Sequence, residues 1–159
     1  MIALWRISAD TRDYEAHDLS GTGAKISGGQ WNRPGLPVVY ASCSIALAVL
    51  ETMAHLAAGS LPLNRFLVRI DVPDDLWATR EQLSEHSAAV GWSAEPAGKV
   101  SLDLGDQWLR GQASVLLQVP SVIVPEERNV LINPLHPGAA RIQSSKIRLF
   151  QYDARTRSA

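Results

Sequence analysis

The sequence is poor in cysteine and in charged residues, and each shortage excludes a class of protein. Its one cysteine, Cys43, has no partner for an internal disulfide, which suits a reducing cytoplasm. Cys43 and the four histidines show none of the spacings of a zinc site, so we expect no metal. Charged residues make up 19% of the chain, against about 25% in a typical domain. The surface is therefore expected to be more apolar than usual, which points to a partner or an oligomer.

Basic runs and membrane segments are also missing. The net charge is −1, so direct binding to nucleic acid has no electrostatic basis. Arg6 interrupts the apolar N-terminus, which excludes a secretory signal. The apolar run 41–63 is long enough for a membrane helix, but Glu51 at its centre and the breakers Gly59 and Pro62 argue against one. We expect a soluble, cytoplasmic protein with no membrane partner.

Several common enzyme motifs are absent as well. The segment "GTGAKISGG" (21–29) has neither the lysine of a phosphate-binding loop nor the glycine spacing of a dinucleotide fingerprint. No G-x-S-x-G occurs, so a serine nucleophile of the hydrolase type is not indicated. Taken alone, these residues predict only a flexible loop.

The apolar pattern predicts an α+β fold with a mixed, largely antiparallel sheet and flanking helices. The length of 159 residues fits a single domain over 1–159. Residues 9–37 look like a long loop, which in a compact domain is usually functional or disordered. The expected strands are 2–8, 37–42, 65–72, 129–133 and 146–152, with two apolar runs, 115–119 and 121–125, broken at Pro120; the expected helices are a long one that Ser42 or Ser44 caps and that ends near Gly59, and short ones within 74–83 and 105–111.

Glu51 is the one fully charged residue of the apolar stretch "IALAVLETMAHLAAG" (45–59). An ionised carboxylate in apolar surroundings is costly unless it is paired, hydrogen-bonded or protonated. One interpretation is a surface pair with His55, one helical turn away, which contributes about 0.2–0.5 kcal/mol. The other is a carboxylate set in an apolar wall to face a developing positive charge. The absence of lysine or arginine nearby favours the second.

Two further side chains are candidates for the same site. Tyr40 ends a strand just before this helix, so it can lie near Glu51, although a core tyrosine is more common. Ser121 is enclosed between Pro120 and Pro125, which fix the local backbone. Prolines in such places more often mark a strand edge.

Four segments in the same order resemble the RES-domain toxins. They are "LWRIS" near the N-terminus, "GGQWNRPGLPVVYAS", the helix with Glu51, and "VPSVIVPEERNVLINPLHP". The resemblance covers about residues 2–150. It implies a fold similar to that of ADP-ribosyltransferase toxins, NAD+ as the substrate, and an Xre-type helix-turn-helix antitoxin that blocks the active site. It leaves open whether the ADP-ribose acceptor is water, phosphate or a host protein.

The resemblance also implies roles for individual residues. Glu51 corresponds to the family glutamate, Ser121 to the family serine, and Tyr40 to the tyrosine that helps hold the nicotinamide end of NAD+. The residues implied to bind NAD+ are Arg6, Gly28, Gly29, Gln30, Trp31 and Asn32.

Position 30 departs from the family pattern. Glutamine stands directly before "WN", where the family leads us to expect arginine. An arginine there would hold the NAD+ pyrophosphate with a charge-assisted fork, which a neutral amide cannot form. Arg6 matches another recurrent position and can replace some of that charge. The alternatives are an active NAD+-consuming enzyme and an NAD+-binding variant with weakened catalysis.

Overall fold

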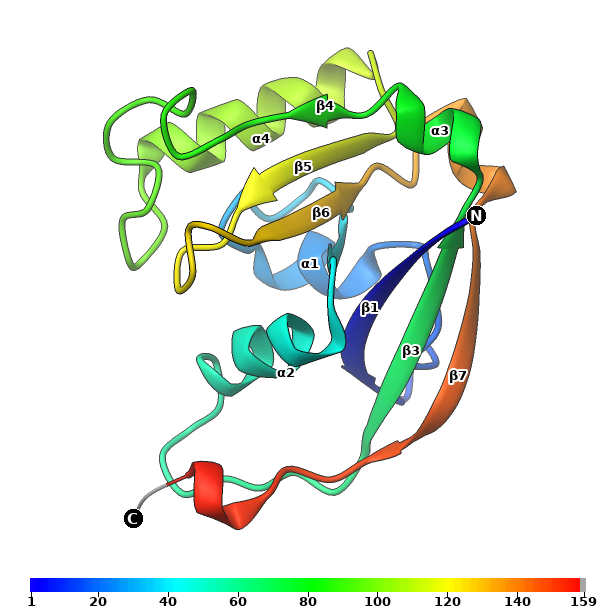
Figure 1. Cartoon of the computed structure of the whole chain (residues 1–159), viewed down its shortest axis with the longest axis vertical. Coiled ribbons are helices and arrows are strands. Elements are labelled where there is room, and N and C mark those ends of the chain that lie inside the picture. Colours follow the sequence, from blue (N-terminus) through cyan, green and yellow to red (C-terminus); the bar gives the residue numbers. More distant parts are fainter. Residues whose placement is uncertain (158–159) are drawn as a thin grey trace.

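The computed structural model describes residues 1–157, which form a seven-stranded sheet with helices around it (Figure 1). The strand order is β4-β5-β6-β2-β1-β3-β7, and every neighbouring pair is antiparallel except β4 with β5. The predicted α+β class with a mixed, largely antiparallel sheet is confirmed. The strands are β1 (Ile2–Ala9), β2 (Val39–Ser42), β3 (Arg65–Val72), β4 (Glu81–Gln82), β5 (Leu116–Pro120), β6 (Arg128–Ile132) and β7 (Gln143–Phe150); the α-helices are α1 (Thr22–Ser27), α2 (Ile45–Met53), α3 (Asp74–Ala78) and α4 (Lys99–Gly111), with 3-10 turns η1 (Pro137–Arg141) and η2 (Ala154–Thr156).

The sheet divides into two halves where β1 meets β2. The register between these strands contains a single residue pair, Trp5 with Ser42, whereas β1 pairs with β3 along its whole length. The half formed by β4, β5, β6 and β2 then diverges from the half formed by β1, β3 and β7, as Figure 1 shows for β5 and β6 against β1, β3 and β7. Beyond this pair, toward Ala9 on β1 and Val39 on β2, the two strands share no hydrogen-bonded ladder, so side chains from both strands can line a cavity between them.

Each half of the sheet is covered by its own helix. Hydrophobic side chains of α4 pack against β5 and β6, and those of α2 pack against β1 and β3 (Figure 1). Side chains alternate along a strand, so β2 serves both sides. Val39 and Ala41 enter the large central core, whereas Val38 and Tyr40 belong to the cluster under α4. In residues 1–157 no helix is long and apolar enough to cross a membrane.

Helix α2, which carries Glu51, begins as predicted and ends earlier than predicted. Ser44 caps it, because its Oγ accepts a hydrogen bond from the Leu47 amide at 3.1 Å. The helix stops at Met53 rather than near Gly59. The carbonyl groups at this end are satisfied by Arg157, whose guanidinium donates to the carbonyls of Met53 (2.9 Å), Leu56 (3.4 Å) and Ala57 (2.6 Å).

Other predicted boundaries were wrong for local reasons. The long loop 9–37 contains the short helix α1, and α4 begins at Lys99 instead of residue 105. The short helix predicted within 74–83 is present as α3, and the chain then enters the short strand β4. The run 121–125 forms a turn instead of a strand, since the hydroxyl of Ser121 accepts two backbone amides that a ladder would otherwise use.

The contact between Arg157 and α2 predicts that the C-terminal segment stabilises the helix that carries Glu51. Arg157→Ala should lower the melting temperature by about 2–4 °C, because it removes hydrogen bonds with a net contribution of about 1 kcal/mol. The matched control is Arg155→Ala, whose side chain is 90% exposed and pairs with the neighbouring Asp153. Equal melting temperatures for the two variants would contradict the prediction.

Candidate active site

Glu51 lies in the last turn of α2 and is held by the sheet. Ser121 Oγ donates a hydrogen bond to Glu51 Oε1 at 2.6 Å, and Asn129 Nδ2 donates to the same oxygen at 2.8 Å. His55 lies beyond the end of the helix, is exposed, and makes no hydrogen bond or ion pair to Glu51 in the described part of the chain. The surface pair with His55 therefore does not form. The cost of withdrawing the carboxylate from water is offset by the neutral donors Ser121 and Asn129 instead.

The hydroxyl of Ser121 has one available direction. Its oxygen accepts hydrogen bonds from the amides of Ile123 (3.1 Å) and Val124 (3.0 Å), which occupy its lone pairs. The hydroxyl proton is then left for Glu51, and Ser121 is fully buried at 0% exposure. In this arrangement Ser121 orients the carboxylate and does not face a ligand.

Tyr40 is fastened to the loop that precedes β2. Its hydroxyl donates to Asn32 Oδ1 at 2.6 Å and accepts from the Trp31 amide at 3.0 Å. Burial raises the pKa of Tyr40 well above its ordinary value, so the phenol keeps its proton. A side chain at Gly29 would place its Cβ 2.7 Å from this hydroxyl. The close approach of Tyr40 therefore explains the glycine at position 29.

Trp31 and Arg33 hold this loop against α4. A Cβ at Gly105 would lie 1.6 Å from the Trp31 carbonyl oxygen, so the loop can meet the helix only at a glycine. Trp31 is 3% exposed and stacks on Trp92, with ring centroids 6.2 Å apart. Arg33 bridges to the carboxylates of Asp103 (2.8 Å) and Asp106 (2.7 Å) on α4. The backbone of the loop is therefore rigidly placed.

Asn32 and Gln30 make the remaining polar contacts of the loop. Asn32, 1% exposed, donates to the carbonyls of Ala24 (2.9 Å) and Leu36 (3.1 Å). Gln30 Nε2 donates to the Trp92 carbonyl at 3.0 Å, and its further contacts are the Ala94 carbonyl (3.4 Å) and Ser101 Oγ (3.3 Å). Packing thus accounts for Trp31 and Asn32. Gln30 faces the start of α4 and the segment before it.

A small cavity of about 50 Å³ lies where the sheet divides, and Arg6 and Tyr40 both line it. Arg6 makes one long hydrogen bond, from Nη2 to Ser8 Oγ at 3.4 Å, and its Nε is buried without a partner. Withdrawal from water lowers the pKa of Arg6. Asp18 lines the same cavity but forms no ion pair with Arg6 within residues 1–157, so the partly buried guanidinium is incompletely satisfied, and an anionic ligand would offset that cost. The rest of the lining is Ser8, Tyr14, Asp18, Gly21, Thr22, Gly23, Ala24 and Val38.

Tyr40 also connects this cavity with Glu51. Tyr40 and Ser42 project from the same side of β2, because they are two residues apart in a strand. Ser42 Oγ donates to Asn129 Oδ1 at 2.6 Å, and Asn129 donates to Glu51. Of the predicted residues, Arg6 and Tyr40 line the same cavity. Glu51 and Ser121 are linked to the strand of Tyr40 by the hydrogen bonds from Ser42 to Asn129 and from Asn129 to Glu51. Gly28 has a φ of +72°, and a Cβ there would lie 2.9 Å from Pro34 Cδ, so this turn of the loop requires glycine.

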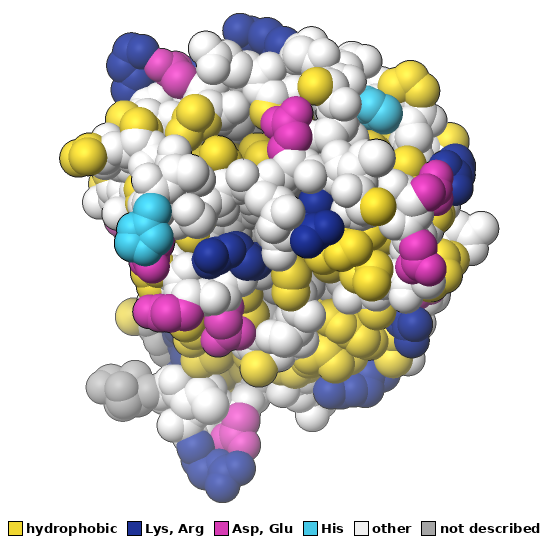
Figure 2. Space-filling model, turned by 45° about the horizontal axis from the view of Figure 1, so that its top comes forward, with side chains coloured by type: hydrophobic (Ala, Val, Ile, Leu, Met, Phe, Trp, Pro, Cys, Tyr) yellow, Lys and Arg dark blue, Asp and Glu magenta, His cyan; other side chains and the backbone are white. Residues whose placement is uncertain are grey.

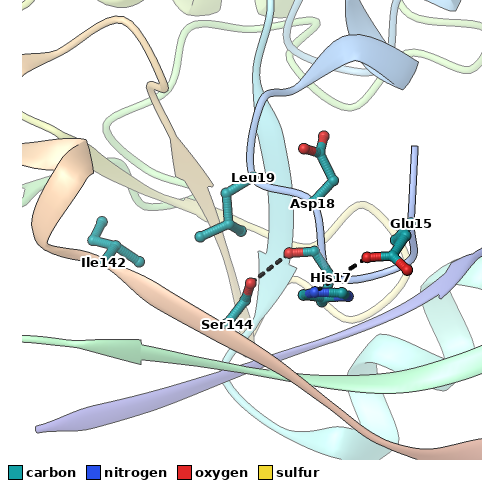
Figure 3. Close-up of a pocket in the computed structure, with 6 residues that line it drawn as sticks. All are labelled: Glu15, His17, Asp18, Leu19, Ile142 and Ser144. Atoms are coloured by element: carbon teal, nitrogen blue, oxygen red, sulfur yellow. Dashed lines mark hydrogen bonds and ion pairs between the residues drawn. The ribbon is translucent and has the colours of Figure 1, made fainter. Parts of the chain in front are cut away.

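A larger cavity of about 350 Å³ lies elsewhere, between the 15–19 segment and β7 (Figure 3). Glu15 and His17 lie side by side on its wall, with Glu15 Oε2 3.6 Å from His17 Nε2. Ser144 donates a hydrogen bond to the His17 carbonyl. It shares Asp18 with the cavity of Arg6, but it also has Glu15 and contains no lysine or arginine, which makes it a poor site for a phosphate, and no predicted residue lines it. Within residues 1–157, no group of three or more His, Cys, Asp or Glu side chains is arranged to hold a metal ion.

Comparison with known proteins assigns the family. The family model for the RES domain matches residues 3–153. The chain belongs to the RES-domain family. This RES domain is 56% identical over 153 residues to a Sphingobium protein named Prs ADP-ribosylating toxin, with 96% of this chain and 95% of the relative covered. It is 40% identical over 148 residues to a Pseudomonas putida protein named Toxin Res, with 92% of each chain covered.

A solved structure supports the fold of this RES domain. A chain of the crystal structure of the Mycobacterium tuberculosis MbcT–MbcA toxin–antitoxin complex superposes with a TM-score of 0.59 over 91% of this chain and 83% of that chain. The identity is 19%, so the likeness concerns the fold alone.

Two polar residues of this RES domain were missed from the sequence. Ser42 and Asn129 join the Glu51 network, although neither stood out from its pattern. Ser42 is the last residue of β2, and Asn129 follows Arg128 at the start of β6. The register of β2 with β6, which places them opposite each other, is not visible in the sequence.

The contacts of Tyr40 predict a measurable structural role. Tyr40→Phe should lower the free energy of unfolding by about 1–3 kcal/mol, because it leaves the buried Trp31 amide and Asn32 Oδ1 without their partner. Urea unfolding measures the change. Tyr14→Phe is the matched control, since the Tyr14 hydroxyl has no hydrogen bond within residues 1–157. A midpoint for Tyr40→Phe that equals the control would contradict these hydrogen bonds.

Proposed function

We propose that this RES domain is the toxin of a toxin–antitoxin pair and cleaves the bond between nicotinamide and ribose in NAD+. The observation that carries the proposal is Arg6, a partly buried guanidinium whose Nε is buried without a hydrogen-bond partner within residues 1–157, in the cavity that Tyr40 shares. Such a group fits the diphosphate of a dinucleotide. The names of the relatives, Toxin Res and Prs ADP-ribosylating toxin, agree with a toxin that uses NAD+.

Glu51 supplies the chemistry in this proposal. When the bond from ribose C1′ to the nicotinamide nitrogen breaks, the bonding electrons leave with nicotinamide, which departs as a neutral molecule. Positive charge then builds on the ribose. A fixed carboxylate in a dry wall stabilises that charge more than water does, because it does not have to reorganise. Glu51 is fixed in this way by Ser121 and Asn129.

Two reactions remain as candidates after nicotinamide has left. In the first, water or phosphate attacks C1′ and NAD+ is degraded. In the second, a side chain of a host protein attacks and becomes ADP-ribosylated, which the name of the Sphingobium relative favours. Release of nicotinamide by the purified chain tests the shared step. Mass spectrometry of cell proteins incubated with the chain and NAD+ then separates the two reactions.

Glu51→Gln should reduce nicotinamide release by about 100-fold or more, because the variant keeps the size and the acceptor oxygen of residue 51 and loses its charge. The melting temperature of the variant should stay near that of the parent, which separates catalysis from folding. Glu126→Gln, at an exposed position, is the control. If Glu51→Gln retains release within a few-fold of the parent, Glu51 is not the catalytic carboxylate.

Arg6→Met should weaken NAD+ binding at least tenfold without loss of stability. The variant removes a partly buried charge that forms no ion pair within residues 1–157, so the melting temperature should be unchanged or higher, while the diphosphate loses its donor. Calorimetric titration with NAD+ and a thermal melt measure the two effects. A lower melting temperature with unchanged NAD+ affinity would show that Arg6 serves the fold.

Position 30 provides a separate test. We propose that an arginine here strengthens the hold on the pyrophosphate, so Gln30→Arg should lower the Michaelis constant for NAD+ or raise turnover by about 10- to 150-fold. Gln30→Lys restores charge without the fork and should recover less. The contacts of Gln30 with Trp92 and Ser101 support the opposite outcome, in which position 30 only fastens the loop. In that case Gln30→Arg changes neither constant.

The partner in this proposal is an Xre-type antitoxin that covers the NAD+ site. Large hydrophobic side chains are exposed on this small protein, among them Leu63 (75%), Val90 (97%) and Leu135 (60%). On the face that Figure 2 shows, hydrophobic side chains gather in patches between scattered charges of both signs. Such a surface suits a protein partner.

A further inference from the structure

Ser42 and Asn129 lie directly opposite each other in the sheet. The register of β2 with β6 pairs them, so their side chains project to the same face. Ser42 is 4% exposed. Polar side chains withdrawn from water in this way need hydrogen-bond partners, and these two residues bond to each other at 2.6 Å.

The hydrogen bond from Ser42 fixes which way the Asn129 amide faces. Ser42 Oγ donates to Asn129 Oδ1, so Nδ2 is turned toward Glu51 and donates to Oε1 at 2.8 Å. The opposite orientation would bring the amide oxygen against the carboxylate and leave the Ser42 proton without its acceptor. The chain of donors from Ser42 through Asn129 to Glu51 therefore has one direction.

Both donors to Glu51 reach the same oxygen. Ser121 and Asn129 each bond to Oε1, and within residues 1–157 no hydrogen bond reaches Oε2. With two fixed donors on Oε1, the carboxylate has a defined plane, and Oε2 is the oxygen left for a substrate. Orientation of this kind matters because a displacement of about 1 Å of a catalytic group can cost about 100-fold in rate.

We propose that Ser42 and Asn129 form a relay that positions Glu51 and assigns Oε2 to the substrate. The assignment rests on the proposed NAD+-cleaving function, since it concerns the same carboxylate. Ser42 and Asn129 are positioning residues: they act through Glu51 and do not touch the substrate.

Four variants test the relay: Ser42→Ala, Asn129→Ala, the double variant, and Asn129→Asp. Asn129→Ala should lower kcat for nicotinamide release roughly 10- to 100-fold, with the Michaelis constant for NAD+ changed less than threefold. Ser42→Ala should lower kcat less, and the double variant should match Asn129→Ala, because Ser42 acts through Asn129. Asn129→Asp has nearly the same shape but cannot donate to Glu51, so it should not rescue activity.

Ser114→Ala is the matched control for a buried, hydrogen-bonded serine outside the relay. Ser114 is 5% exposed and bonds to Trp108 Nε1 and the Leu116 carbonyl. Its loss should lower the melting temperature and leave kcat unchanged. Unchanged kcat in Asn129→Ala, or additive losses of kcat in the double variant, would overturn the relay.

Melting temperatures separate failure of the relay from failure of the proposed function. If the parent chain neither releases nicotinamide nor modifies protein, the proposed function is wrong, and the relay is decided by stability alone. Ser42→Ala and Asn129→Ala should then lower the melting temperature by less in combination than the sum of their separate effects. Additive losses would show that the two residues are independent and would overturn the relay.

Discussion

The single registered pair between β1 and β2, Trp5 with Ser42, determines where the site of this RES domain lies. The two halves of the sheet meet at that pair, and along β2 toward Val39 they diverge. Arg6 follows Trp5 on one strand and Tyr40 precedes Ser42 on the other, so the divergence opens a cavity between a cation and an aromatic ring. The same serine bonds to Asn129, which holds Glu51. One point of the sheet therefore connects the residues that we propose bind NAD+ with the carboxylate.

The two charged residues of the proposed site, Glu51 and Arg6, differ in how well their hydrogen-bonding groups are satisfied. Glu51 is surrounded by neutral donors that fix its orientation. Arg6 has one long hydrogen bond and a buried Nε without a partner. A chain selected for stability alone would pair such a guanidinium with a carboxylate or replace it with a hydrophobic side chain. The contrast between a satisfied anion and an unsatisfied cation is typical of a site that receives a negatively charged ligand beside a developing positive charge.

The sequence allowed the fold class and most strands to be predicted, because alternation in segments such as "RFLVRIDV" depends on local burial alone. It also made Glu51 a candidate, because its isolation among apolar residues is a local property. The partners of Glu51 were harder to predict. Asn129 meets it only through strand register, and Ser121 through a turn made by its own hydroxyl. The roles of Gly29 and Gly105 depend on close approaches between distant segments, which no periodicity reveals.

The most direct test of this account is a crystal structure of the Glu51→Gln variant with NAD+ bound. The account predicts the diphosphate within hydrogen-bond distance of the Arg6 guanidinium, the nicotinamide beside Tyr40, and the adjoining ribose against residue 51. NAD+ bound in the cavity of Glu15 and His17, or a ribose remote from residue 51, would contradict it.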